Sequence, residues 1–248
     1  MRSRKKTLLI ITLAIGLLLG GGVWLAYRAA RHIPEFYADT LDQQPDSARQ
    51  ASHQMRKRVT ALASDTSRSG EWSETFTADQ INGWLAVDLI EKHPDTLPEG
   101  VHDPRVSITA DEARIGCQFD EPWAGVVYSI AIEPYIAEPN VVAVRFRSAR
   151  AGALPMPLGR VIEEISAGAA ERGVRLEWQQ IDGDPVLLLP LAEDDGRYVL
   201  EAIDLADGAI RFSGQTLSRG RSPSTQNPTT TPTAKATDQS VENENLQR

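Results

Sequence analysis

The chain of 248 residues has a formal net charge of −8, and its first 31 residues hold six basic and no acidic side chains, so the remainder carries −14. This acidic balance argues against a nucleic-acid partner and against an electrostatic attraction to anionic lipid headgroups, because both need clusters of lysine and arginine. The single cysteine, Cys117, excludes an intramolecular disulfide.

An uncharged segment of nineteen residues, 8–26, precedes the rest of the chain. As a helix it would rise roughly 29 Å, close to the roughly 30 Å of a bilayer's hydrocarbon core, so we predict a transmembrane helix over 8–27. Basic residues crowd positions 1–7, which predicts a cytoplasmic N-terminus and an extracytoplasmic domain in a single-pass protein of the cell membrane. A cleaved signal peptide is the alternative, but the segment is longer than usual and ends in Trp24 and Tyr27.

A linker and a mostly polar helix are expected over 28–70. Pro45 suits the first turn of this helix, and small or apolar residues recur every three or four positions from Ala48 to Leu62. We expect that stripe to pack on the domain, with a helix lying on the membrane as the alternative.

The next helix has a sequence-level start signal. Thr77 and Gln80 form a capping box, so the helix begins at Ala78, and His93 followed by proline ends it. Trp84 lies on its apolar face, where it is either a core residue or part of a ligand groove.

From Asp103 the apolar period changes to two, which predicts strands. A hairpin turns at Asp111 and Glu112, and Cys117 alternates with apolar residues there, as a buried hydrophobe does more often than a nucleophile. Further strands are predicted over 126–137, 141–147, 174–178, 186–191, 199–205 and 210–212, with an irregular segment at 152–157 and a helix from Leu158 to Gly173.

These patterns predict an α+β fold in which an N-terminal transmembrane helix precedes a twisted antiparallel sheet of about eight strands packed with two amphipathic helices. The expected organisation is a basic N-terminus, the transmembrane helix, a linker with its helix, the α+β domain and a disordered tail rich in serine, threonine and proline, over 1–7, 8–27, 28–70, 71–218 and 219–248.

The sequence shows no catalytic apparatus. Its four histidines lack metal-ligand spacing, no serine sits in a nucleophile elbow, and no glycine-rich loop leads from a strand into a helix. We therefore expect a protein that is not an enzyme and that carries no cofactor or metal.

Two short motifs resemble a known family. Phe76 to Asn82 before an apolar helix, and Gly152 to Pro157 before Val161 and Ile165, are similar to the YpmS-like bacterial proteins, membrane-anchored and of uncharacterised function. The resemblance implies one N-terminal membrane helix and an outer domain. The predicted sheet curled over helices also resembles, in shape only, the tubular lipid-binding and AsmA-like domains.

Two strands carry apolar residues on both faces, over 126–132 and 186–191. An antiparallel strand with one core face would alternate, so something must cover the second face. We predict a membrane-facing groove of at least about 300 Å³ that takes a lipid or other hydrophobic ligand, and six residues are expected to line it: Trp84, Tyr128, Ile130, Val144, Leu187 and Leu189. The alternative is a structural or assembly protein of the cell envelope, with protein partners and these strands only as core.

Overall fold

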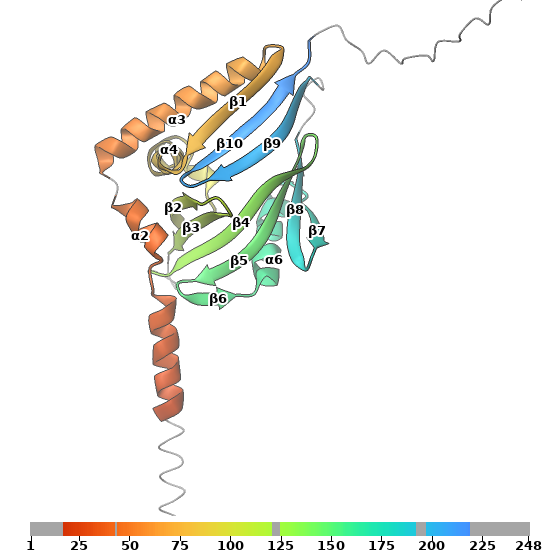
Figure 1. Ribbon diagram of the computed structural model, residues 1–248. Coiled ribbons are helices and arrows are strands. Elements are labelled where there is room, and N and C mark those ends of the chain that lie inside the picture. The colour runs from red at the N-terminus through yellow and green to blue at the C-terminus, as the bar shows by residue number, and fades with distance from the viewer. Residues whose placement is uncertain (1–16, 43, 121–124, 192–196, 219–248) are drawn as a thin grey trace, which may run out of the picture. The chain divides into compact units, whose positions relative to one another are not determined.

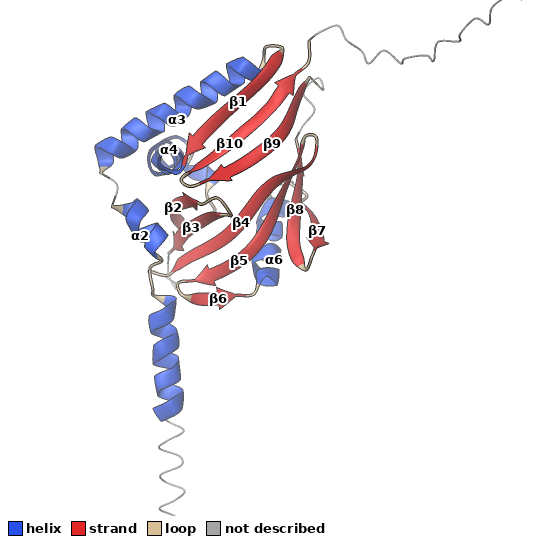
Figure 2. Cartoon of the chain, viewed as in Figure 1, coloured by secondary structure: helices blue, strands red, loops and turns tan. Residues whose placement is uncertain are grey.

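The computed structural model describes residues 17–42, 44–120, 125–191 and 197–218. The described strands form two antiparallel sheets (Figures 1 and 2). Sheet A has three strands, in the order β1 (Gly70–Thr77), β10 (Ala209–Thr216), β9 (Tyr198–Ala206). Sheet B runs in the order β2 (Val101–Ile108), β3 (Ala113–Phe119), β4 (Val127–Glu138), β5 (Val141–Ala151), β8 (Asp184–Pro190), β7 (Glu177–Ile181), and β6 (Leu154–Met156) pairs with β5.

Helices lie before and between these strands. In chain order they are a helix over 17–30, α2 (Glu35–Leu41), α3 (Pro45–Thr66), α4 (Ala78–Trp84) and α6 (Leu158–Glu171). The helix of α4 continues through a π-helical segment, η1 (Leu85–Leu89), into α5 (Ile90–Lys92), and a 3₁₀ turn, η2 (Pro94–Thr96), follows. The predicted starts of α3 and α4 are confirmed.

The predicted fold class is wrong at its N-terminal end. The described helix covers 17–30. Its side chains are exposed, Leu18 by 75% and Trp24 by 58%, and in the described part of the chain no helix is long and apolar enough to cross a membrane. The transmembrane helix predicted over 8–27 is therefore corrected: the described helix, 17–30, is exposed and does not qualify as a membrane span. Residues 1–16 lie outside the described residues, and the localisation stays a prediction.

The α+β class and the large antiparallel sheet are found, but the single sheet of about eight strands is corrected to two sheets. The strand β1 was not predicted at all. Its register pairs Gly70 with Thr216 and Thr77 with Ala209, a pairing between segments far apart in the sequence. Such a partner leaves no local signal, since alternation shows only that a strand forms and not with what it pairs. The predicted tail, 219–248, lies outside the described residues.

The start of α4 is fixed as the capping box predicted. Thr77 Oγ1 accepts from the backbone N–H of Gln80 at 3.2 Å, and Gln80 Oε1 accepts from the backbone N–H of Thr77 at 3.1 Å.

Farther along α4, the buried Asn82 side chain bonds both backbone groups of Val106 on β2, at 2.7 and 2.8 Å. This side-chain amide therefore attaches α4 to sheet B.

The helices α3 and α4 cross in close contact. A Cβ added to Gly83 would lie 2.7 Å from the backbone oxygen of Ala48 and 2.8 Å from the backbone nitrogen of Ser52, so only glycine fits there. Beside the crossing, the buried carboxylate of Asp88 accepts a hydrogen bond from Ser52 and pairs with Lys92. The N-terminal half of the predicted α3 stripe is thus packed on the domain, whereas Val59 is 48% exposed.

One of the links between the two sheets is a turn residue of sheet B. Asn140, between β4 and β5, adopts a positive φ of 63°. Its side chain accepts from the backbone N–H of Leu200 at 2.8 Å and donates to the backbone oxygen of Tyr198 at 3.0 Å, both on β9. Asparagine is one of the few residues that tolerate this conformation, and here its amide also satisfies the start of a strand in sheet A.

Candidate functional site

Strand register brings five of the six predicted site residues onto one face of sheet B. Directly opposed residues of antiparallel strands point to the same face, and so do alternate residues along a strand. Val144 opposes Leu187, and Leu189 lies two residues farther along β8. Ile130 follows Tyr128 by two residues on β4, and Ile132 pairs with Phe146, two residues from Val144.

We call this surface the apolar face of sheet B. Its members are apolar or weakly polar side chains of five strands: Ala113, Ile115, Cys117, Phe119, Tyr128, Ile130, Ile132, Val144, Phe146, Trp178, Leu187 and Leu189.

Much of the apolar face is not buried. Ile115, in β3 with a neighbouring strand on either side, is 43% exposed, and Leu189 is 36% exposed. Phe119, Tyr128 and Ile130 are half-buried. A sheet face that served only as core would bury side chains in this central position, so part of the face lacks a cover.

One end of the apolar face is well covered. Val106, Ile108 and Ala113 form a buried cluster, and Ile81 and Leu85 of α4 and η1 pack against it together with Ile132.

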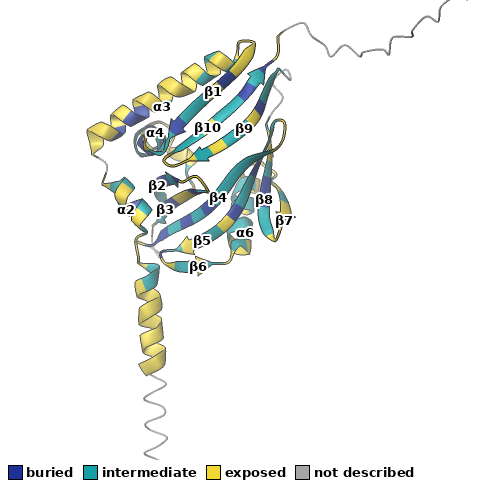
Figure 3. Ribbon diagram, viewed as in Figure 1, coloured by how far each residue is buried: buried dark blue, intermediate teal, exposed yellow. Residues whose placement is uncertain are grey.

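Among the described residues, α6 covers the other end. The Trp178 ring packs on Phe146 with centroids 5.1 Å apart, and its Nε1 donates to Ser166 Oγ of α6 at 3.0 Å. No residue of α6, all of which the structure describes, is fully buried, although Val161, Ile162 and Ile165 form an apolar stripe. Figure 3 shows α6 without the dark blue of buried residues that marks the β strands beside it.

Trp84, the sixth predicted residue, lies apart from these five. It belongs to α4 and its ring lies against His93, with centroids 6.2 Å apart. The continuous groove predicted to join all six residues stays a prediction.

The titratable side chains of the apolar face, Cys117 and Tyr128, are neutral at pH 7. Burial raises the pKa of the Cys117 thiol to about 11, so the thiol is neutral at pH 7. Burial, with the neighbouring Cys117, also raises the pKa of Tyr128, whose ring packs edge-on against Phe119 at 5.0 Å. Among the described residues, no group of three or more histidine, cysteine, aspartate or glutamate side chains could hold a metal ion.

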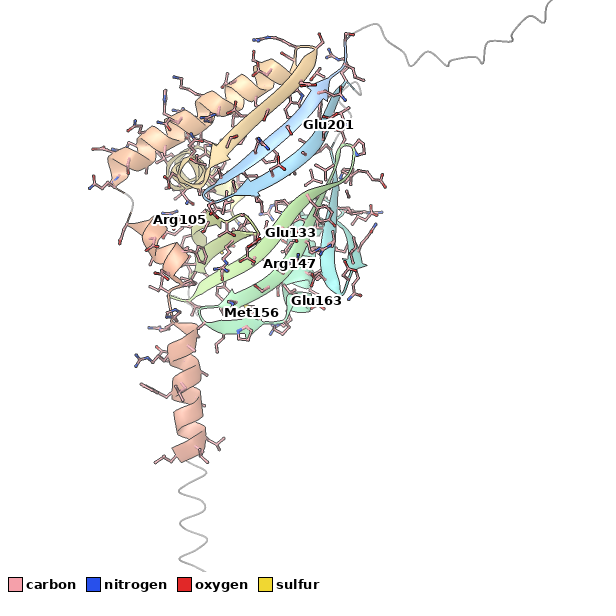
Figure 4. The ribbon with its side chains drawn as sticks, viewed as in Figure 1. Arg105, Glu133, Arg147, Met156, Glu163 and Glu201 are labelled. Atoms are coloured by element: carbon pink, nitrogen blue, oxygen red, sulfur yellow. The ribbon has the colours of Figure 1, made fainter. Side chains whose placement is uncertain are left out.

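The opposite face of sheet B carries most of the charged side chains, although Val127, Ala131, Ala143 and Val186 on the same face are buried. Arg147 of β5 pairs with Glu133 of β4 and, at 2.9 Å, with Asp184 of β8, and Figure 4 labels Glu133 and Arg147 on their strands. Nearer α2, this face borders a cavity of about 500 Å³ between the sheet and the segment 32–36. Of the six predicted residues only Ile130 lines it.

Sequence reasoning missed Ile115, Phe146, Trp178 and the polar cavity as parts of a site. The alternation of Ile115 with Cys117 and Phe119 was visible, but nothing in it shows that the face stays open. The signal for the cavity was weaker still, because its lining combines residues of β3, β4 and β5 with a linker that is distant in the sequence.

Comparison with known protein families, curated proteins and solved structures finds no match to this chain. The resemblance to YpmS-like proteins stays a prediction.

Proposed function

We propose that the protein binds a lipid or another long apolar ligand on the apolar face of sheet B, beneath and beside α6. The observation that carries this proposal is the exposure of Ile115 and Leu189 on a face whose register aligns apolar side chains over five strands. At about 25 cal/mol per Å², covering that surface would stabilise a complex substantially, whereas leaving it in water offers no gain.

The weak attachment of α6 supports the same reading. Its described side-chain hydrogen bond to the sheet is the one between Trp178 and Ser166, and its apolar stripe is only half-buried. A helix held in this way can shift outward at low cost, and an acyl chain between helix and sheet would then bury both apolar surfaces.

The test is binding of a fluorescent fatty acid to the full chain, followed by competition with unlabelled lipids. Replacing Ile115 with glutamate puts a charge on the open part of the face, and because this position is 43% exposed the fold should tolerate it. We expect Ile115→Glu to weaken binding at least about tenfold, since a carboxylate in an apolar contact costs more than 1.4 kcal/mol.

The matched control is Val59→Glu, because Val59 is a similarly exposed apolar residue on α3, away from the apolar face. It should leave the affinity unchanged. If the wild-type chain binds no apolar probe, or if both variants weaken binding equally, the open face is not a ligand site and the envelope-scaffold alternative takes its place.

A further inference from the structure

The polar cavity on the opposite face of sheet B has the features of a second, separate site. Its volume of about 500 Å³ lies in the range of small-molecule sites, roughly 300 to 1,000 Å³. Strands β3, β4 and β5 form its floor, and the segment from His32 to Phe36 borders it from above the sheet. Gly116 lets α2 approach at one end, because a Cβ there would lie 2.9 Å from Tyr37.

Strand register gathers hydrogen-bond donors on the cavity floor. Ser129 of β4 directly opposes Arg150 of β5, and in the next row on the same face Ala131 opposes Ser148. The side chains of such neighbours lie about 5 Å apart, within reach of one small ligand. Arg114 of β3 lines the same cavity.

Several of these groups have no partner in the described part of the chain. Arg114 Nε is bonded to Glu112 Oε1 at 2.6 Å, but Arg150 makes no hydrogen bond or ion pair with a described residue. The hydroxyls of Ser129, which is only 8% exposed, and of Ser148 likewise have no described partner. A guanidinium beside two free hydroxyls suits a phosphate or carboxylate, which accepts several hydrogen bonds at once.

Two carboxylates limit what kind of anion fits, and one of them, Glu112, is paired with Arg114. Glu35, in the first turn of α2, also lines the cavity and has no partner among the described residues. It would repel a simple anion but attract an ammonium group on the same molecule.

We propose that this cavity binds a small zwitterion whose phosphate or carboxylate group is held by Arg150, Ser129 and Ser148 and whose ammonium group pairs with Glu35. The ligand is either a free molecule of this class or a phosphoethanolamine lipid headgroup. The site lies on the opposite face of the sheet from the apolar face, so it does not depend on the function proposed there.

The test uses calorimetric titration of the full chain with O-phosphoethanolamine, and with inorganic phosphate and ethanolamine as its two halves. O-phosphoethanolamine should bind at least about tenfold more tightly than either half, because two linked contacts reinforce each other. Arg150→Gln should weaken this binding at least about tenfold. The control Arg160→Gln removes an arginine of α6 that does not line the cavity, and it should change nothing.

Two further experiments distinguish the role of Glu35 from that of Arg150, and a free ligand from a lipid headgroup. Glu35→Gln should abolish the preference for O-phosphoethanolamine over phosphate while leaving phosphate binding intact. Flotation with vesicles of phosphatidylethanolamine in phosphatidylcholine, against phosphatidylcholine alone, tests the headgroup source, which should again depend on Arg150. No binding of O-phosphoethanolamine, or equal losses in Arg150→Gln and Arg160→Gln, would overturn the proposal. Ile115→Glu should leave the binding of O-phosphoethanolamine unchanged. A failure of the cavity proposal can therefore be distinguished from a failure of the function proposed for the apolar face.

Discussion

Two helices cover the same apolar face of sheet B, and they are held very differently. The helix that begins with α4 buries Gln80, Asn82, Gly83, Asp88 and Leu89. The helix α6 buries no residue, although Val161, Ile162 and Ile165 form an apolar stripe on it. In Figure 1, α4 lies against α3, whereas α6 lies along sheet B beside β5 and β8.

The difference is one of polar attachment as well as packing. Asn82 bonds the backbone of β2, and Asp88 bonds α3, so moving α4 would leave buried polar groups without partners at about 1–3 kcal/mol each. Moving α6 would break the Trp178 bond and expose side chains that are already half-exposed. The comparison shows that buried polar groups attach α4 to the core and that α6 lacks such an attachment among the described residues, so under the proposed function α6 is the cover that a ligand would displace.

The largest expected effect is at the contact between α3 and α4. Gly83→Ala places a methyl group 2.7 Å from backbone and side-chain atoms of α3, so we expect a loss of about 3 kcal/mol in the free energy of unfolding, measured by urea denaturation. A loss below about 1 kcal/mol would mean that the two helices can separate, and α4 would no longer differ from α6.

The next effect concerns Asp88. Burial raises its pKa, but hydrogen bonds from Lys92 and Ser52 and the charge of Arg56 outweigh that, and the net pKa is lowered. A carboxyl with a lowered folded-state pKa stabilises the fold above its unfolded value, near 4, and that stability is lost as the pH falls toward the folded-state pKa.

Asp88→Asn should therefore lower the free energy of unfolding by about 2 kcal/mol at pH 7, because the pairing with the carboxylate is lost. The loss is no larger because Lys92 and Arg56 are half-exposed and can return to water. The wild type should lose stability below about pH 4 more steeply than the variant. Parallel stability curves from pH 7 to pH 3 would contradict the assigned role of Asp88.

A smaller effect is expected at the cap of α4. Thr77→Ala removes the side-chain acceptor of the Gln80 N–H and should lower the free energy of unfolding by about 1 kcal/mol. Thr77→Ser keeps the hydroxyl and is the control. An equal loss in both variants would assign the effect to strand β1 and not to the cap.

The smallest effect distinguishes α6 from α4 at a matched glycine. A Cβ on Gly168 of α6 would meet only the flexible end of Arg172, at 3.7 Å. Gly168→Ala should therefore stabilise the protein by about 0.5 kcal/mol, because alanine loses less backbone entropy in a helix. Destabilisation would show that α6 is packed more tightly than its exposure indicates.

Local signals in the sequence predicted much of this fold. The capping box at Thr77 depends on residues three apart, and the β2–β3 hairpin on alternation beside a short turn, so both were visible without the structure. The pairing of β1 with β10 and the division into two sheets depend on segments far apart, and no local pattern encodes them.

The candidate site was predicted in part for the same reason. Apolar residues on β4, β5 and β8 could be assigned to one face from their spacing, and the register agrees. The exposure of Ile115 and the lack of burial in α6 could not be predicted, because they depend on how much of the face α4 and α6 leave uncovered.

The most direct test of the account is amide hydrogen exchange of the full chain, followed peptide by peptide with and without a long-chain fatty acid. The free protein should exchange faster in α6 than in α4, because opening α6 breaks fewer buried contacts. The ligand should slow exchange over 158–171 and in the β3 and β4 peptides that carry Ile115 and Ile130, and it should leave α4 unchanged. Exchange in α6 as slow as in α4 without ligand, or no change in α6 at saturating ligand, would contradict the account.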